Sequence, residues 1–550
     1  MTATLFRPNL IANTLTASFI DTYPHKSALH SSLTQLVDYD KYGVPSKQGP
    51  SYYYYHNRNA PQAVLYKIDA LDAEPTVVLN VNEIAEREGK EGSMTGHTLD
   101  GKLMAYGLSR NGSDWAEVKI KDTETMEDLE DVVSWFKFTG ISWTHDNQGF
   151  FYTKYPEPAS IASTDPTTTP EPNAQGTETD SNANPQVYYH RLGTAQSSDT
   201  LVFSDLANPL HMLSSSVTDC GAFIIVYESS PKKRSNQVKV TRLGPSTLAD
   251  PASIIWIDVV TTYDRVEFYF HVSHPEKSPR GKIVVVDVEN MGPGFVDVVP
   301  ETEDVLSEFL AVDRDKLALV YLKDLMHLMY VHELRTGKRI GEVEVPLGTI
   351  GSLKGDKEES ELFFSVKTFL SPGTIYRYDF AIPNPTLTPP SSVAPPSPTV
   401  STRLFRPDCF HNQTSALLDQ RRHRNSNVPP ASDGPNPRFV EPDTPTRCYR
   451  SSTYAGSSGC ATSRMAFWLW PNIRGGGEFG EKWHEAGIQE RKQNVFDDFQ
   501  YAVKWLHHEE YTQPNRTAIM GGSNGGLLVA ACVNQAPELF GCAITSMGVL

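Results

Sequence analysis

The stretch MGGSNGGLLVA, residues 520–530, contains one serine among four glycines and matches the pattern G-x-S-x-G. A glycine turn between a strand and a helix is the context in which this pattern exposes a serine hydroxyl above a sheet. We therefore predict that Ser523 is a nucleophile and that the backbone N–H of Asn524, at the helix N-terminus, faces the oxyanion. Gly521 would permit a close backbone approach, and Gly525 would let the helix pack on the strand. The alternative is a glycine-rich turn that caps an ordinary helix.

The residues around this turn have the pattern of a βαβ unit. Strands are predicted over 516–520 and 542–549, with an apolar helix over 525–534 between them. Upstream, another helix is expected to begin at Asn494 and to carry the acidic pair 497–498 in its first turn, where acidic side chains are favourable. Its apolar face consists of Phe496, Phe499, Val503 and Leu506. This order of elements favours a parallel sheet.

The middle of the chain contains a repeat of strand-forming runs. These runs begin near Tyr52, Met104, Phe150, Phe223, Val266, Leu317 and Leu362. All but one of the intervals lie between 43 and 52 residues, near the roughly 40–50 residues expected for a four-stranded propeller blade. The exceptional interval of 73 residues contains an insertion at 156–185 that is rich in Pro, Thr, Ser and Asn, and we expect it to lie on the surface.

Each run is followed by a second alternating run, and such pairs indicate neighbouring strands. The second runs begin at Ala63, Trp115, Gln186, Gln237, Lys282, Leu328 and Thr374. Seven such units predict a seven-bladed β-propeller over about residues 51–380. A pair of large β-sandwiches is the alternative that the repeat alone leaves open.

The composition changes after Phe380. Residues 381–470 are crowded with proline, serine and arginine and contain hardly any periodic apolar stretch. We expect this segment to be loop or disordered, although an unstructured span of this length is unusual inside an enzyme. The predicted domains are a lead-in at 1–50, the propeller at 51–380, this segment, and a partial catalytic domain at 471–550.

Two blocks of sequence surround the serine. They are NIRGGGEFGEKWHEAGIQERKQNVFDDFQYAVKWL at 472–506 and GGSNGGLLVAACVNQAPELFGCAITSMGVL at 521–550. Both resemble the catalytic domain of the prolyl oligopeptidase family of serine peptidases. Four upstream stretches resemble the propeller of the same family: GLSRNGSDW at 107–115, FTGISWTHDNQGFFYTKYPEP at 138–158, GTETDSN at 176–182 and FLSPGTIY at 369–376. The resemblance implies a seven-bladed β-propeller joined to an α/β-hydrolase domain, which is incomplete here.

The resemblance also implies roles for single residues. Ser523 corresponds to the nucleophile, and Asn524 to the residue whose backbone N–H forms half of the oxyanion hole. Phe138 corresponds to an aromatic contact with the substrate, and core packing is its alternative role. Arg474 lies in a loop that the family places on the active-site side, but it could equally be a structural ion-pair partner. His484 gains no catalytic role from the resemblance.

Members of this family hydrolyse peptide bonds on the carboxyl side of proline in short peptides, and the propeller excludes folded proteins. The chemistry is acyl transfer: a histidine takes the serine proton, an aspartate holds that histidine, and backbone donors stabilise the oxyanion. The resemblance therefore implies a serine endopeptidase for short proline-containing peptides, without a metal or organic cofactor. A dipeptidyl or acylaminoacyl peptidase and a macrocyclising relative remain as alternatives. An alternative from a different functional class is a catalytically inactive propeller that binds peptides or partners.

The groups that would activate the serine have no candidates after it. In α/β-hydrolases the triad follows the order Ser, Asp, His. The sequence after Ser523 contains no Asp and no His, and its only acidic residue there is Glu538. The stretch STYAGSSG at 452–459 is not equivalent to the family's tyrosine motif that supplies the other oxyanion donor. We therefore expect an incomplete or mis-predicted chain, and loss of a triad member lowers the rate by about 10⁴.

The composition bounds the partners and the location. The 49 Lys and Arg against 66 Asp and Glu give a net charge of −17, which argues against nucleic acid or an anionic membrane as partner. No run approaches the roughly 18 apolar residues that cross a bilayer, and no secretory pattern opens the chain, so we expect a cytoplasmic monomer. Six cysteines without CxxC spacing predict no disulfide framework. His507 and His508 point about 100° apart on a helix, so we expect them to be solvated rather than to bind a metal.

Overall fold

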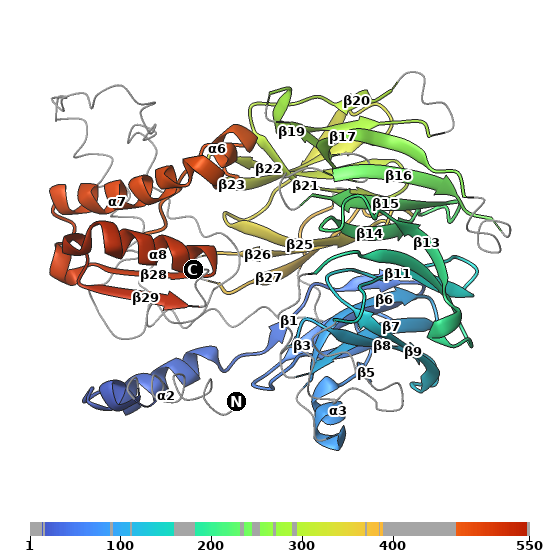
Figure 1. Ribbon diagram of the computed structural model, residues 1–550, viewed down its shortest axis with the longest axis horizontal. Coiled ribbons are helices and arrows are strands. Elements are labelled where there is room, and N and C mark those ends of the chain that lie inside the picture. Colours follow the sequence, from blue (N-terminus) through green and yellow to red (C-terminus); the bar gives the residue numbers. More distant parts are fainter. Residues whose placement is uncertain are drawn as a thin grey trace.

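The fold was analysed on a computed structural model of the 550-residue chain (Figure 1). The structure describes residue 14 and residues 17–88, 92–110, 113–158, 182–230, 236–244, 254–267, 271–274, 276–288, 294–368, 371–383, 385–388 and 469–546. Most of the insertion at 156–185 and of the proline-rich segment at 381–470 therefore lies outside the described residues, as does most of GTETDSN. No helix in the described part of the chain is long and apolar enough to cross a membrane.

The first two sheets of the chain are antiparallel. The first has the order β1-β3-β4-β5, with β2 pairing β3: β1 (Lys41–Tyr42), β2 (Ser46–Gln48), β3 (Ser51–Asn57), β4 (Val64–Ile68) and β5 (Thr76–Leu79). The second has the order β13-β12-β11-β9-β8-β7-β6, with β10 pairing β11: β6 (Gly92–Asp100), β7 (Leu103–Arg110), β8 (Ala116–Asp122), β9 (Asp128–Phe136), β10 (Ser142–Trp143), β11 (Gly149–Lys154), β12 (Gln186–Arg191) and β13 (Thr200–Ser204). The pairing of Lys154 with Phe136 joins its two halves, β6–β9 and β10–β13.

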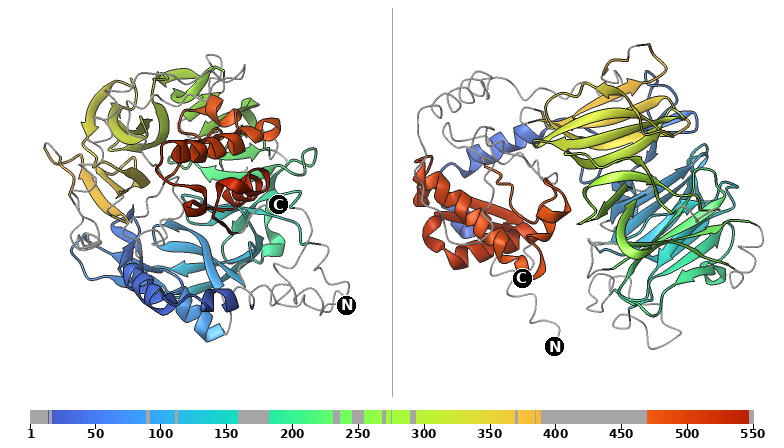
Figure 2. Two further views of the ribbon diagram at one scale, coloured as in Figure 1. Left: turned by 90° about the vertical axis from the view of Figure 1, so that its left-hand side faces the viewer. Right: turned by 90° about the horizontal axis from the view of Figure 1, so that it is seen from above.

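Three further antiparallel sheets follow. The third runs in chain order: β14 (Met212–Val217), β15 (Phe223–Ser229), β16 (Asn236–Arg242), β17 (Ile257–Glu267), β18 (His271–His274), β19 (Ser278–Val285) and β20 (Val296–Val299). The fourth contains β21 (Val305–Val312), β22 (Lys316–Lys323), β23 (Met326–Glu333) and β24 (Arg339–Val343). The fifth contains β25 (Thr349–Gly355), β26 (Glu361–Lys367) and β27 (Thr374–Asp379). Figure 2 shows the five sheets following one another around a ring, which is the arrangement of a β-propeller.

The strand-forming runs of the sequence largely coincide with these strands, and the run beginning at Val266 is the main exception. We predicted one strand there, but β17 and β18 are two antiparallel strands in which Val266 pairs with Val272 and Glu267 with His271. Continuous apolar periodicity cannot distinguish a single strand from a tight reversal, because both keep side chains on alternating faces.

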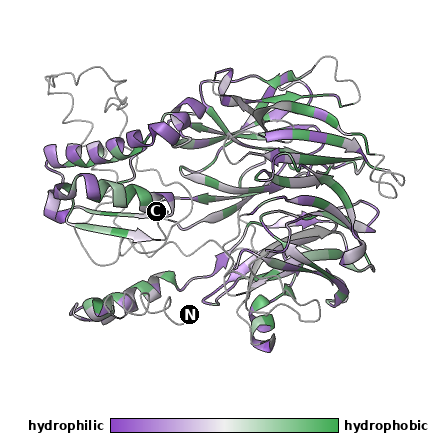
Figure 3. Cartoon of the chain, in the orientation of Figure 1, coloured by the Kyte–Doolittle hydropathy of each residue, from purple (hydrophilic) through white to green (hydrophobic). Residues whose placement is uncertain are grey.

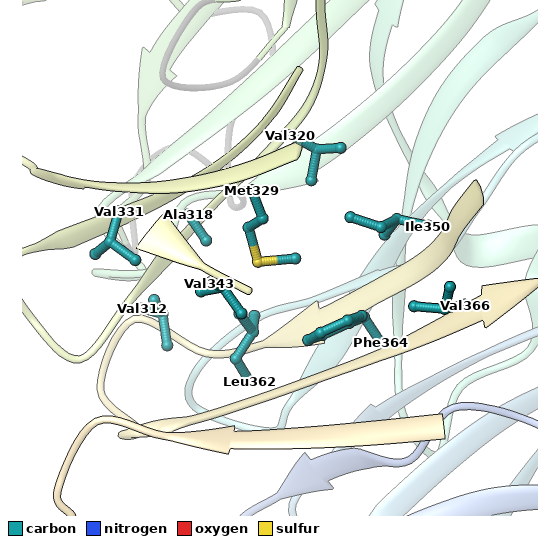
Figure 4. Close-up of a cluster of buried hydrophobic side chains, with 10 residues drawn as sticks. All are labelled: Val312, Ala318, Val320, Met329, Val331, Val343, Ile350, Leu362, Phe364 and Val366. Carbon is teal, nitrogen blue, oxygen red and sulfur yellow. The ribbon is translucent and has the colours of Figure 1, made fainter. Parts of the chain in front are cut away.

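The cores of the propeller lie between neighbouring sheets. One cluster joins the fourth and fifth sheets through Val312, Ala318, Val320, Met329, Val331, Val343, Ile350, Leu362, Phe364 and Val366 (Figure 4). On β22 and β26 the hydrophobic residues between them are buried as well, because these strands pack against a neighbouring sheet on each face. Figure 3 shows hydrophobic residues along the strands of the propeller.

The first and the fifth sheets meet without a shared strand pairing, and a polar clasp joins them. The hydroxyl of Tyr52, on β3, donates a hydrogen bond to Glu361, on β26, at 2.5 Å. Lys47, on β2, forms an ion pair with Glu359 at 2.6 Å, and Arg377 donates to the other oxygen of Glu361. The ring of Tyr52 also packs edge-on against Phe363. Side chains therefore hold the two ends of the propeller sequence together.

A buried histidine links three strands of the second sheet. His190, on β12, is fully buried, with Nδ1 2.7 Å from Asp199 and Nε2 3.1 Å from Asp131. The hydroxyl of Tyr152 donates to the second oxygen of Asp199. Burial alone would lower the pKa of His190, but the hydrogen bonds and charges of Asp199 and Asp131 raise it above its ordinary value of 6.5.

The remaining elements lie beside the propeller on one side (Figure 1). They are α6 (Glu481–Glu485), α7 (Gln493–His508), β28 (Ala518–Gly522), α8 (Asn524–Gln535) and β29 (Cys542–Ser546). The N-terminal helix α2 (Lys26–Val37) projects toward the same side, whereas α3 (Val81–Glu88) follows β5 in the propeller. β28 and β29 pair in parallel and α8 connects them, so the predicted βαβ unit is confirmed.

Candidate active site

Ser523 occupies a sharp turn between β28 and α8. Its backbone has φ 52° and ψ −119°, a left-handed conformation that is strained for any residue with a Cβ. Three backbone hydrogen bonds hold it: Ser523 N–H donates to Ser546 O on β29 at 3.0 Å, and the N–H groups of Gly526 and Leu527 donate to Ser523 O at 2.9 and 3.2 Å. A strained serine on a strand-to-helix turn has the geometry of a nucleophile elbow.

The two glycines of the motif make different contributions to this elbow. A Cβ on Gly521 would lie 2.2 Å from the carbonyl oxygen of Gly525, so the first position must lack a side chain. A Cβ on Gly525 would meet nothing within 4 Å. The expectation that Gly525 is needed for helix packing is therefore wrong in this structure, because its Cα hydrogens point into open space.

The first residues of α8 provide the electropositive side of the turn. Asn524 is the first residue of the helix, and N–H groups in the first turn have no acceptor within the helix. Ser523 and Asn524 are both exposed, so a substrate carbonyl can approach the hydroxyl and this N–H together. The helix dipole favours negative charge at the same point.

No general base contacts Ser523 in the described part of the chain, where its hydroxyl has no hydrogen-bond partner. The three histidines of 469–546 bond elsewhere. His484 donates from Nδ1 to Gly475 O at 2.7 Å, and His507 Nε2 lies 2.9 Å from the hydroxyl of Thr517. His508 is exposed beside Glu509, as expected, but half-buried His507 is not the solvated residue that we predicted.

Arg474 anchors the glycine-rich loop 472–477 to helix α7. Its backbone N–H and its Nε both donate to Asp498 Oδ2, at 2.9 and 2.8 Å, and a third nitrogen contacts Oδ1 at 2.5 Å. The side chains are only 14% and 8% exposed, so the pair is largely desolvated. The structural role of Arg474 is thus the one observed.

The same contact corrects the prediction for the start of α7. We expected the helix to begin at Asn494 with its acidic pair in the first turn, but it begins at Gln493 and has no acidic residue there. Asp498 lies in the second turn and faces Arg474. Its charge compensates a specific guanidinium rather than the helix dipole.

The loop after Arg474 contacts the propeller. Gly480 has φ 84°, and a Cβ there would lie 2.4 Å from the carbonyl oxygen of Pro279 on β19. Next to this contact, a cleft of about 510 Å³ lies between the propeller and the segment that contains α6. Its lining comes from both sides: Pro279, Arg280, Glu301, Thr302 and Glu303 from the propeller, and Phe479 and Lys482 from the loop and α6.

Phe138 follows β9 and is not part of a core. Its side chain is 52% exposed and its backbone is left-handed, with φ 53°. The ammonium group of the buried Lys137 lies 4.9 Å from the ring of Phe138 and 4.5 Å from the ring of Trp115. The alternative that Phe138 packs in the core is therefore wrong, and its ring is available to a ligand.

Two family models match this chain. The model of the prolyl oligopeptidase N-terminal β-propeller domain matches residues 12–389, and the model of the prolyl oligopeptidase family matches residues 460–550. The chain belongs to the prolyl oligopeptidase family. Family membership accounts for a β-propeller followed by a peptidase domain of α/β-hydrolase type, as the sequence resemblance implied.

Curated relatives align along almost the whole chain. The prolyl oligopeptidase A of Galerina marginata is 31% identical over 579 aligned residues, which cover 97% of this chain and 75% of the relative. A prolyl endopeptidase of Elizabethkingia miricola is 28% identical, and the alignment covers 97% of this chain and 73% of the relative. A dual-function macrocyclase-peptidase of Galerina marginata is 27% identical, and the alignment covers 97% of this chain and 75% of the relative.

Solved structures of the family share the fold. Prolyl oligopeptidase B from Galerina marginata, bound to a 35-residue hydrolysis and macrocyclization substrate, superimposes with a TM-score of 0.75 at 24% identity, covering 98% of this chain and 76% of that one. One of two prolyl endopeptidases analysed for the role of inter-domain dynamics gives a TM-score of 0.76 at 24% identity. The superposition covers 100% of this chain and 78% of that one.

Sequence reasoning did not find the residues that line the cleft or the partner of Arg474. Arg280 and Glu301 belong to no sequence motif. They lie opposite Lys482 because the loop that contains Gly480 contacts β19. The Arg474–Asp498 pair spans 24 residues, which is beyond the range of helix-periodicity rules. The acidic pair at 497–498 was a visible signal, but it was assigned to the wrong partner.

Proposed function

We propose that this protein is a serine endopeptidase that hydrolyses short peptides on the carboxyl side of proline, with Ser523 as the nucleophile. The observation that carries the proposal is the elbow: an exposed serine hydroxyl on a left-handed residue at the N-terminus of α8. The substrate class is taken from relatives that are named prolyl oligopeptidase and prolyl endopeptidase.

In the proposed reaction, Ser523 Oγ attacks the carbonyl carbon of the peptide and the carbonyl oxygen becomes an oxyanion. The N–H of Asn524 and the N-terminal end of α8 stabilise that negative charge, which a preorganised donor does at little reorganisation cost. The serine proton must pass to a base. The described residues bring no imidazole to the hydroxyl, so the reaction requires a base from outside them.

We assign Phe138 to substrate contact, as the family resemblance implies. A half-exposed aromatic ring beside a buried ammonium group offers an apolar face to a peptide side chain. A Phe138→Ala variant is expected to raise KM more than it lowers kcat, because the ring would bind the ground state and the transition state about equally.

A fluorophosphonate probe and a fluorogenic peptide with proline before the reporter group test the nucleophile. The enzyme proposal expects labelling of Ser523, cleavage after proline, and loss of both in Ser523→Ala. Replacing the proline of the peptide by alanine should lower kcat/KM. Mass spectrometry of the products separates hydrolysis from ring closure, which matters because one relative is a macrocyclase-peptidase.

The second candidate is an inactive propeller protein that binds peptides, and the unpartnered Ser523 hydroxyl favours it. A serine without its base reacts about 10⁴-fold more slowly. This candidate expects that the 550-residue chain is labelled no faster than Ser523→Ala, while a proline-containing peptide still binds with the same affinity to both. Rapid labelling of Ser523 alone would eliminate it.

Three further properties belong to the same proposal. We propose seven blades, because the strands group as β1–β5, β6–β9, β10–β13, β14–β17, β17–β20, β21–β24 and β25–β27. We propose domain boundaries at 1–50, 51–380, 381–470 and 471–550. We also propose a cytoplasmic monomer that binds neither nucleic acid nor membranes, in keeping with the net charge of −17.

A further inference from the structure

Three potential metal ligands converge at the junction of the second and third sheets of the propeller. Asp205 directly follows β13, His211 directly precedes β14, and Glu228 lies on β15. One ligand atom from each residue lies within 4.8 Å of the others. His211 Nδ1 contacts Glu228 Oε1 at 2.5 Å. None of these residues belongs to the candidate active site.

Glu228 is the most unusual member of this cluster, because its carboxylate is buried and only half satisfied. Its side chain is 1% exposed, and Oε2 has no hydrogen-bond partner among the described residues. Buried polar atoms are almost always paired, so an orphaned carboxylate oxygen calls for a proton or a cation.

No lysine or arginine of the described residues neutralises the two carboxylates. The only ion pair of Glu228 in that part of the chain is with His211, whose side chain is 10% exposed. Asp205 accepts hydrogen bonds from Ala207 N–H at 2.9 Å and from Asn208 Nδ2 at 2.8 Å, both of them neutral donors. Within the described residues, two carboxylates thus face a single imidazole, and a cation would compensate the second negative charge.

We propose that Asp205, His211 and Glu228 bind one divalent transition-metal ion, with Zn²⁺ as the probe. One imidazole and two carboxylates suit Zn²⁺ better than Ca²⁺ or Mg²⁺, which take oxygen ligands only. Bonds of about 2.0–2.2 Å place tetrahedral ligands about 3.4 Å apart, so the 2.5 Å contact between His211 and Glu228 must open when the ion binds. Asp205 is the least buried member and the one that can move.

The ion would join the connection between β13 and β14 to β15. It is a structural site and does not depend on the proposed peptidase activity. The sequence contains no signal for it, because positions 205, 211 and 228 match no regular ligand spacing and only the pairing of β14 with β15 brings them together. From the sequence we expected no metal, and this proposal departs from that expectation.

Calorimetry on the chelator-treated 550-residue chain tests the site directly. One equivalent of Zn²⁺ should bind, and Mg²⁺ should bind at least about 100-fold more weakly. Co²⁺ should give a visible absorption spectrum typical of nitrogen and oxygen ligands in a four- or five-coordinate site. Binding of Zn²⁺ should also raise the melting temperature, since the ion binds the folded state.

Variants separate this site from other histidines. His211→Ala and Glu228→Gln should each weaken Zn²⁺ binding about tenfold or more, whereas His508→Ala, which removes an exposed histidine beside Glu509, should leave it unchanged. Glu228→Gln preserves shape, so it remains informative if His211→Ala does not fold. The proposal is overturned if no stoichiometric Zn²⁺ binds, or if Glu228→Gln binds Zn²⁺ as the unaltered chain does. Either result would mean that a proton shared by Asp205 and Glu228 satisfies the buried oxygen.

Discussion

Ser523 holds a backbone conformation that residues with a Cβ rarely adopt, and the glycine two positions before it makes this possible. The carbonyl of Gly525 occupies the space in which a side chain at 521 would lie. The motif predicted both the turn and its serine, because the pattern encodes the steric requirement directly. It could not predict which glycine is indispensable, since that depends on where the helix backbone passes.

Gly521→Ala is expected to destabilise the fold by about 1–3 kcal/mol, because the new methyl group forces two backbones apart. Urea denaturation would measure the change. Gly525→Ala is the matched control: its methyl group meets open space, and alanine favours a helix by up to about 1 kcal/mol over glycine. Equal losses in the two variants would contradict the role assigned to Gly521.

His190 predicts a pH dependence of stability. Its folded pKa is raised above 6.5, so folding takes up a proton between the two pKa values. The resulting stabilisation is complete below pH 6.5 and disappears as the pH rises through the folded pKa. In denaturant titrations, the stability difference between the unaltered chain and His190→Gln should therefore be larger at pH 6 than at pH 9. A difference that grows with pH would show that His190 is neutral in the folded protein.

At the scale of elements, the sequence predicted strands far better than their connections. Period-two alternation is a local property, and the predicted runs coincide with strands such as β11, β22 and β26. The division of the Val266 run into β17 and β18 and the start of α7 depended on contacts with other segments. In the candidate site, the turn at Ser523 and its βαβ unit were predictable from local patterns, but the exposure of Phe138 and the cleft were not.

The ion pair between the loop 472–477 and α7 is expected to contribute to the stability of the peptidase part. Asp498→Asn leaves the buried guanidinium of Arg474 without its counter-charge, and breaking a buried pair in this way costs about 3–5 kcal/mol.

The exposed pair Arg339–Glu342, with both side chains 48% exposed, is the control for that change. Glu342→Gln should alter the free energy of unfolding by no more than about 1 kcal/mol. Thermal denaturation followed by circular dichroism compares the two variants. If Asp498→Asn lowered the free energy of unfolding no more than Glu342→Gln does, the loop 472–477 would be held by its other contacts.

At the scale of the whole molecule, the ring of sheets is closed by side chains of the first and fifth sheets. Tyr52→Phe removes the hydroxyl that Glu361 accepts and is expected to cost about 1.5–3 kcal/mol, as for hydrogen bonds to charged groups. Hydrogen exchange should accelerate in β3 and β26 together. Tyr54→Phe is the control on the same strand, because the Tyr54 hydroxyl makes no hydrogen bond with the described residues. Faster exchange in β3 alone would mean that the clasp does not couple the sheets.

The separation of the two halves of this clasp has a consequence for biosynthesis. Tyr52 and Glu361 are 309 residues apart. At a synthesis rate of about 5–20 residues per second, roughly 15 to 60 s pass between the emergence of the first strand and that of its partner. During that time the apolar edge beside Tyr52 has no native neighbour. The nascent chain therefore exposes apolar surface to the ribosome and to chaperones. The lifetime of this exposed state is set by translation speed.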